Sequence, residues 1–246
     1  MGLANSSYYI KDGLLYDRAS TILDFVIEPW MVDWKVKASR KDGVEYAVRA
    51  VKEGIDKYRM PNSALDTSRK ALKIGSRVDE LVERDCLDGS YSLKKSDLPE
   101  VHSCMSAWDK FKQRYDVSVL STQETVYNKE LRVAGTLDLI LLINGVVMLV
   151  DIKSSISISI KYWLQTSFYY WTKELRKING NSCTGIIRLD KQASEFEFMD
   201  NNKANMPLEQ SRDAFRNQVN LYRFYNAELD ITKGENHERI KREISE

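Results

Sequence analysis

Cysteine and long apolar runs are both scarce in this chain of 246 residues. Its cysteines, Cys86, Cys104 and Cys183, are an odd and widely spaced set, which excludes a disulfide framework and the paired spacing of a zinc site. No segment approaches the roughly 20 consecutive apolar residues that a membrane-spanning helix requires. Residues 1–7 have neither the basic start nor the apolar centre of a signal peptide. We therefore expect a cytoplasmic protein with no membrane partner.

The sequence also lacks the Gly-x-x-x-x-Gly-Lys-[Ser/Thr] loop that cradles nucleotide phosphates, so we expect no use of ATP. What it does contain is ordinary for an enzyme domain: 43% apolar and 30% charged residues, with a net charge of +1. Length and composition agree with a single soluble enzyme domain: the length is within range for an α/β domain with a helical extension, and the chain can bury a substantial core.

A predicted β-hairpin is the most informative feature. The apolar runs Leu139 to Ile143 and Val146 to Val150 flank Asn144-Gly145. Asn-Gly is the strongest short-range signal for a two-residue hairpin turn, because both positions tolerate positive φ. The sequence therefore predicts two antiparallel strands joined at this dipeptide.

Charged side chains gather at the open end of this hairpin. Asp138 lies at the start of the first strand, and Asp151 and Lys153 lie at the end of the second, so antiparallel pairing brings them together. Alternation along the strand puts Asp151 and Lys153 on one face, and the Ile152 carbonyl is a further oxygen ligand. Carboxylates and a carbonyl suit Mg²⁺ or Mn²⁺, and a lysine beside such a cation suits phosphodiester hydrolysis. The alternative is a half-buried Asp/Lys ion pair without catalytic function.

This constellation resembles the PD-(D/E)XK nuclease superfamily, in its RecB-like exonuclease branch. Gly135 to Asp138 matches the G-x-x-D element, Asp151 to Lys153 matches D-x-K, and Gln165 to Tyr169 matches the Q-x-x-x-Y element of the following helix. Upstream, Gly75 to Asp79 lies where the branch has G-x-x-x-H, and Glu124 lies where the preceding strand carries a glutamate.

The resemblance implies roles for these residues. Asp138, Asp151 and the Ile152 carbonyl would bind the metal, with Glu124 as a supporting ligand, and Lys153 would act on the attacking water. Gln165 and Tyr169, which share a helix face at i and i+4, would hydrogen-bond near the lysine or a phosphate. Taken without the resemblance, the pair would be core or interface residues. Asp79 replaces the histidine of the branch, and is either a ligand that favours Mg²⁺ or a residue on the polar face of an amphipathic helix.

The implied activity is that of a metal-dependent deoxyribonuclease. We expect an exonuclease that acts on single-stranded DNA or duplex ends in DNA processing, recombination or repair, similar to stand-alone enzymes that bacteriophages and organelles encode; a phage enzyme would work in the host cytoplasm. Some RecB-like relatives hold an iron–sulfur cluster through a downstream cysteine triplet, but only Cys183 lies downstream here, so we expect no cluster. The alternatives are a structure-specific or restriction-like endonuclease and a non-catalytic nucleic-acid-binding or protein-binding module on the same fold.

Basic residues are concentrated ahead of the hairpin. Residues 35–77 contain twelve Lys or Arg against five Asp or Glu. Such a segment could line a groove that follows the phosphates of DNA or could be a solvated helix face. The residues that we expect to contact DNA are Arg69, Lys70, Lys73 and Arg77.

The predicted fold is α/β: a restriction-endonuclease-like core with a central mixed β-sheet flanked by helices. We expect a mostly helical N-terminal extension over residues 1–67, packed on the core, with breaks at Pro29 and Pro61. The nuclease core would span residues 68–232. Residues 233–246 would form a charged C-terminal tail.

Overall fold

The computed structural model describes residues 3–4, 8–25, 29–53, 62–178 and 181–232. The chain divides into two compact units, one formed by Met1–Phe25 with Val78–Glu246 and the other by Val26–Arg77. Pro61 and the predicted charged tail over residues 233–246 lie outside the described residues.

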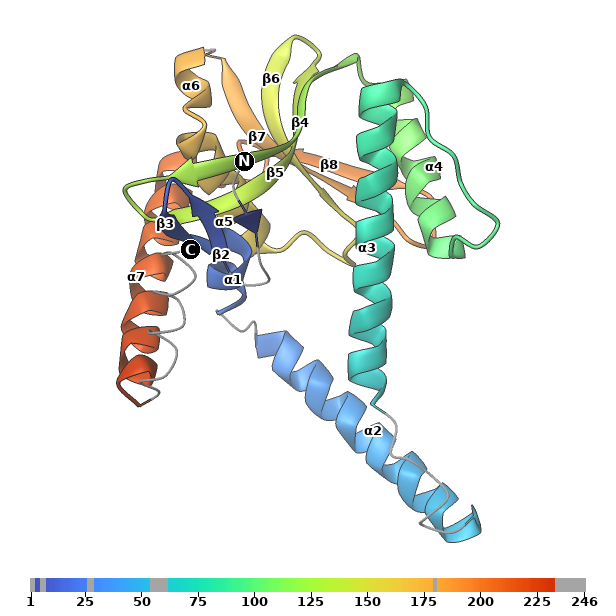
Figure 1. Ribbon diagram of the computed structural model, residues 1–246. Helices are drawn as coiled ribbons and strands as arrows, with labels where there is room; N and C mark the ends of the chain where they lie inside the picture. Colours follow the sequence, from blue (N-terminus) through green and yellow to red (C-terminus); the bar gives the residue numbers. More distant parts are fainter. Residues whose placement is uncertain (1–2, 5–7, 26–28, 54–61, 179–180, 233–246) are drawn as a thin grey trace. The chain divides into compact units, whose positions relative to one another are not determined.

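A single mixed β-sheet forms the centre of the larger unit (Figure 1). Most neighbours are antiparallel, but β3 runs parallel to β5 and β6 runs parallel to β7. The prediction of a mixed sheet flanked by helices is thus confirmed. The strands are β1 (Leu3–Ala4), β2 (Tyr8–Lys11), β3 (Leu14–Arg18), β4 (Val117–Asn128), β5 (Val133–Ile143), β6 (Val146–Lys153), β7 (Ser182–Leu189) and β8 (Phe196–Asp200).

The predicted hairpin is strands β5 and β6. Their register runs from Ile143 opposite Val146 to Leu139 opposite Val150. Asn144 and Gly145 make the turn with φ of 48° and 80°, as expected for a type I′ turn whose twist matches that of the strands. Strand β5 begins at Val133, so Asp138 lies inside the strand and not at its start.

Three helices cover one face of the sheet: α1 (Ala19–Asp24), α5 (Ile160–Thr172) and α7 (Leu208–Thr232). Their apolar side chains form one buried cluster with strands β5 and β6, in which Phe168 stacks on Phe215 with ring centroids 4.6 Å apart. The short helix α6 (Leu175–Ile178) follows α5. The central strands are therefore fixed from behind by a well-packed apolar layer.

Helix α4 (Pro99–Arg114) packs against β7 and β8, on the side of the sheet away from α7 in Figure 1. Its buried stripe of Met105, Trp108 and Phe111 contacts the phenylalanines of β8 through Phe111. The indole N–H of Trp108 donates to Asp85 of helix α3 (Ser63–Asp88) at 2.7 Å. This bond ties the C-terminal half of α3 to the same unit as the sheet.

The prediction of a helical extension was wrong for the first residues of the chain. Tyr8–Lys11 and Leu14–Arg18 form a second hairpin, whose turn is Asp12-Gly13 with φ of 52° and 70°. Strand β3 then joins the central sheet beside β5. These strands therefore belong to the sheet and not to a helical extension. The sequence carries the local signal for this hairpin, Asp-Gly between two apolar runs that contain tyrosine.

The smaller unit is helical. It contains α2 (Pro29–Glu53) and the N-terminal part of α3. Pro29 begins α2, where a proline costs no helical hydrogen bond. The buried carboxylate of Asp42 accepts a hydrogen bond from the backbone N–H of Ser63 at 2.8 Å. Asp42 thereby satisfies one of the free donors at the start of α3.

Candidate functional site

The candidate site lies where strand β5 changes partner. Along one edge, β5 pairs with β3 at Val133 and Ala134, and it pairs with β6 only from Leu139 onward. Residues 135–138 lie between these two registers. The edge of the sheet is therefore open at the position of Asp138.

Asp138 spans this gap with its side chain. The next pair in the β5–β6 register after Leu139 and Val150 would be Asp138 and Asp151, but β6 has begun to diverge. The backbone N–H of Ile152 instead donates to Oδ2 of Asp138 at 2.9 Å. Because the N–H and C=O of a strand residue point to the same edge, the Ile152 carbonyl also faces the gap.

Asp151 and Lys153 form an ion pair in the same place, with 2.7 Å between Oδ2 and Nζ. The Asp151 side chain is only 2% exposed, so the hairpin end is not the solvated surface that an isolated strand end would offer. Its Oδ2 receives no well-directed hydrogen bond from the described residues. The ammonium group of Lys153 also lies over the ring of Tyr162, 5.2 Å from its centroid.

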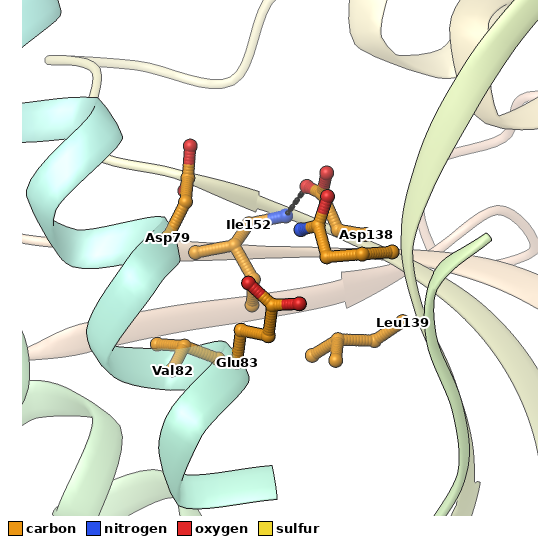
Figure 2. A pocket seen from close by; sticks show the side chains of 7 residues that line it. Asp79, Val82, Glu83, Asp138, Leu139 and Ile152 are labelled. Atoms are coloured by element: carbon orange, nitrogen blue, oxygen red, sulfur yellow. Dashed lines mark hydrogen bonds between the residues drawn. The ribbon is translucent and has the colours of Figure 1, made fainter. Parts of the chain in front are cut away.

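Helix α3 supplies more carboxylates. Asp79 and Glu83, one turn apart on α3, line a small pocket together with Asp138, Gln123 of β4 and Ile152. In Figure 2, Glu83 extends from α3 into the space in front of Asp138 and Leu139. The pocket has about 10 Å³ of free volume, about what a single water molecule requires.

Two of these pocket residues were not predicted. Glu83 follows Asp79 by four residues and therefore shares its helix face, so the spacing was a usable signal. No sequence pattern pointed to Gln123. The structure thus adds one carboxylate and one amide to the predicted set.

The site carries more negative than positive charge. Although Asp79 is an exposed residue, desolvation of its carboxyl group and the nearby Asp138 raise its pKa to about 7, against the effect of Lys153. Burial raises the pKa of Asp151, and the ammonium of Lys153 opposes that rise. Burial alone would lower the pKa of Lys153, but Asp151 and Asp138 raise it. A cation in the pocket would neutralise the excess of carboxylates.

Gln165 and Tyr169 meet as predicted for one helix face. The amide Nε2 of Gln165 donates to the Tyr169 hydroxyl at 3.1 Å. Tyr169 is buried, and its pKa is raised by burial, with smaller effects from Asp151 and Asp138. Gly135 accommodates the tyrosine ring, because a β-carbon at this position would lie 2.5 Å from its oxygen. The G-x-x-D and Q-x-x-x-Y elements are therefore in direct contact.

Glu124 does not line the pocket. Its Oε1 pairs with Nζ of Lys173 beyond the end of α5, and its Oε2 accepts from Ser121 at 3.2 Å. The neighbouring residue Gln123 takes the place at the pocket that the sequence had assigned to Glu124. In this structure the Glu124 carboxylate belongs to an ion pair outside the pocket, and its role as a supporting ligand stays a prediction.

The four basic residues predicted to contact DNA lie on α3, in the smaller unit. Arg69, Lys73 and Arg77 recur every four residues and so follow one face of the helix. Arg69 makes an exposed ion pair with Asp66 at 3.8 Å, which is too weak to hold its guanidinium in place. DNA contact by this face stays a prediction.

The donor chemistry of the site fits a hard cation. Carboxylate, amide and carbonyl oxygens are the ligands that Mg²⁺ and Mn²⁺ prefer, and the charge of the pocket favours a dication. In the described ranges, no three side chains of His, Cys, Asp or Glu are grouped closely enough to form a complete metal site by themselves. Mg²⁺ commonly binds through one or two carboxylates, with waters and substrate phosphates filling its shell, and Asp138 with Asp151 would provide such a pair.

No protein-family model matches the sequence, and no curated protein matches it closely enough to count as a relative. Within the described ranges, no helix combines the length and the apolar composition needed to cross a membrane.

Proposed function

We propose that this protein is a metal-dependent deoxyribonuclease that hydrolyses phosphodiester bonds, working as an exonuclease on single-stranded DNA or duplex ends. One observation carries the proposal. At the point where β5 and β6 separate, Asp138 is bonded to the backbone of Ile152 while Asp151 is paired with Lys153. An open sheet edge thus brings together two carboxylates, an ammonium group and the Ile152 carbonyl, which faces the gap between β5 and β6.

Each group has a distinct part in the proposed reaction. A bound Mg²⁺ or Mn²⁺ supplies a Lewis acid and an activated water. Asp138 and Asp151 would hold the cation, and the Ile152 carbonyl would add an oxygen. Asp138 is held for this role by the Ile152 N–H, which fixes the orientation of its carboxylate.

Lys153 stabilises the charge that grows on the phosphoryl oxygens. Its ammonium is held on two sides, by the Asp151 carboxylate at 2.7 Å and by the ring of Tyr162. A cation fixed in this way needs little reorganisation when the transition state forms, which is where electrostatic catalysis gains most. The lysine would also orient the water that attacks phosphorus.

Gln165 and Tyr169 support this centre from α5. Their mutual hydrogen bond and the packing of Tyr169 on Gly135 fix the strand segment that leads to Asp138. The pair would position the catalytic strand and reach a phosphate only through Gln165, whose side chain is less buried than that of Tyr169.

The test is incubation of the purified protein with end-labelled linear and circular single-stranded DNA and with blunt duplex DNA, each in Mg²⁺, in Mn²⁺ and in EDTA. Metal-dependent loss of linear substrates with circles left intact is the expected result. Cleavage of circles would replace the exonuclease by an endonuclease. DNA binding without cleavage of any substrate would contradict the proposal and indicate a non-catalytic binding module.

A further inference from the structure

Gln123 has an unusual backbone conformation. Its φ is 48°, in the left-handed region. The described non-glycine residues with positive φ lie in turns or loops, with Gln123 as the exception inside a strand. A side chain with a β-carbon is strained in this region, and such strain concentrates at functional sites. The conformation of Gln123 therefore requires an explanation.

The distortion lies directly across from Asp138. Thr122 pairs with Leu139 and Glu124 pairs with Leu137, so Gln123 stands opposite Asp138. On the other side of β5, Asp151 follows the last paired position, Leu139 opposite Val150, at the point where β6 begins to diverge. Gln123 therefore stands directly across from Asp138, and Asp151 lies at the end of the neighbouring strand pairing.

The residue before Gln123 also has an unpartnered polar group. The Thr122 hydroxyl is buried and has no hydrogen-bond partner among the described residues. A left-handed residue within a strand re-aims its side chain, as β-bulges near active sites do. Here the re-aimed side chain lines the pocket that also holds Asp79, Glu83 and Asp138.

The chemistry of the pocket explains what an amide adds. Three carboxylates line the pocket, and further negative charge would increase their mutual repulsion. The amide oxygen of glutamine is a neutral ligand of the kind that hard cations accept, and its NH₂ group donates hydrogen bonds to carboxylates. A glutamine therefore completes an oxygen-rich site without adding charge.

We propose that Gln123 is a cation-positioning residue, whose side-chain amide oxygen joins the coordination shell of the divalent ion beside Asp138, directly or through one bound water. This inference rests on the proposed function for the presence of the cation. It assigns to the strained strand position a role that no motif in the sequence indicates.

The experiment compares four variants by calorimetric titration of the metal-stripped protein with Mn²⁺, in the absence of nucleic acid. Gln123→Gly removes both the amide and the backbone strain, and Gln123→Met removes the amide alone. Gln123→Glu keeps an oxygen at this position. Glu174→Gly is the matched control, because Glu174 has a φ of 54° but lies at the end of α5, where it pairs with exposed Lys177.

We expect both Gln123→Gly and Gln123→Met to weaken Mn²⁺ binding by roughly 10-fold or more, while Gln123→Glu retains it. Thermal unfolding without metal separates strain from binding. Gln123→Gly should leave the thermal unfolding midpoint unchanged or raise it by up to about 4 °C, because the backbone strain is removed. Gln123→Met should not raise this midpoint. Glu174→Gly should leave Mn²⁺ binding unchanged. Excess metal should restore cleavage by Gln123→Met.

Unchanged Mn²⁺ affinity in both Gln123→Gly and Gln123→Met would overturn the inference, and so would a wild-type protein that binds no Mn²⁺. Failure of the proposed function has a different signature. A wild-type protein that binds Mn²⁺ but cleaves no DNA would contradict the nuclease assignment, while the calorimetric comparison would still decide the role of Gln123.

Discussion

Tyr169 lies so close to Gly135 that any β-carbon on the glycine would overlap its ring, at 2.5 Å from the oxygen and 2.7 Å from a ring carbon. This contact joins helix α5 to the strand that carries Asp138. We predict that Gly135→Ala destabilises the protein by about 1–3 kcal/mol. The displaced tyrosine should also lower cleavage roughly 100-fold, because small shifts of catalytic groups are costly. Denaturant unfolding and initial cleavage rates measure the two effects.

Gly43→Ala is the control for this substitution. Gly43 lies in α2, and a β-carbon there would contact nothing within 4 Å, so alanine should be neutral or slightly stabilising. In a Tyr169→Ala background, Gly135→Ala should cost little further stability, because the ring that the added β-carbon would meet is absent. Equal stability of Gly135→Ala and wild type would disprove the steric contact.

The hydrogen bond from Gln165 to Tyr169 predicts energetic coupling between these residues. Tyr169→Phe and Gln165→Leu should each cost about 1 kcal/mol of stability, and the double variant should cost less than their sum because the lost interaction is shared. A double-mutant cycle on stability and on cleavage rate measures the coupling. Strict additivity in both quantities would mean that the pair does not act as a unit.

Asp79 should decide the preference for metal. Its carboxylate lines the pocket beside Asp138, and it adds negative charge that a hard dication favours. Asp79→His should keep activity in Mn²⁺ and lose it preferentially in Mg²⁺, because imidazole suits Mn²⁺ better, while Asp79→Ala should weaken activity in both. Rates are measured over a titration of each metal. Identical titration curves for the three proteins would leave Asp79 as a helix residue without a role in metal binding.

The basic face of α3 predicts a salt effect on DNA binding. Joint neutralisation of Arg69, Lys70, Lys73 and Arg77 should weaken binding of single strands of any sequence. It should also reduce the slope of log K against log salt by about 0.7 for each lost phosphate contact. Fluorescence anisotropy at several salt concentrations gives the slope.

A charge-matched control separates this effect from a change in net charge. Four exposed lysines of the larger unit, Lys94, Lys95, Lys129 and Lys203, are neutralised in the control protein. The control should keep more of the wild-type slope than the α3 variant does. Equal slopes in both variants would identify the α3 face as a merely solvated one.

The features that could be predicted from the sequence are local. The Asn144-Gly145 turn fixes the register of its hairpin, and that register alone puts Asp138 near Asp151. Alternation along β6 correctly paired Asp151 with Lys153. Helical spacing likewise placed Gln165 beside Tyr169. In each case the residues lie within one element or one tight hairpin.

The features that were missed depend on tertiary structure or on a strained backbone. The ion pair of Glu124 with Lys173 depends on how α5 packs against β4, and the sequence does not show that neighbour. The left-handed conformation of Gln123 has no signature, because glutamine seldom adopts it. The hairpin at Asp12-Gly13 is different, because its turn dipeptide is a clear local signal in the sequence. The prediction of a helical extension over residues 1–67 did not take this signal into account.

The burial of Asp151 makes Lys153 the sharpest test of the whole account. Lys153→Met would leave the Asp151 carboxylate, 2% exposed, without its counter-ion, which should lower the stability of the metal-free protein by about 3 kcal/mol. Combining Lys153→Met with Asp151→Asn should restore much of that stability, because no unpaired charge remains. Cleavage should not return, since the double variant lacks both a metal ligand and the ammonium group.

The direct measurement is the rate at which the Lys153→Met and Asp151→Asn/Lys153→Met proteins degrade end-labelled single-stranded DNA in saturating Mg²⁺, after circular dichroism has shown that both are folded. We predict that both cleavage rates fall by several powers of ten relative to wild type. A folded Lys153→Met protein that cleaves within about tenfold of the wild-type rate would contradict it.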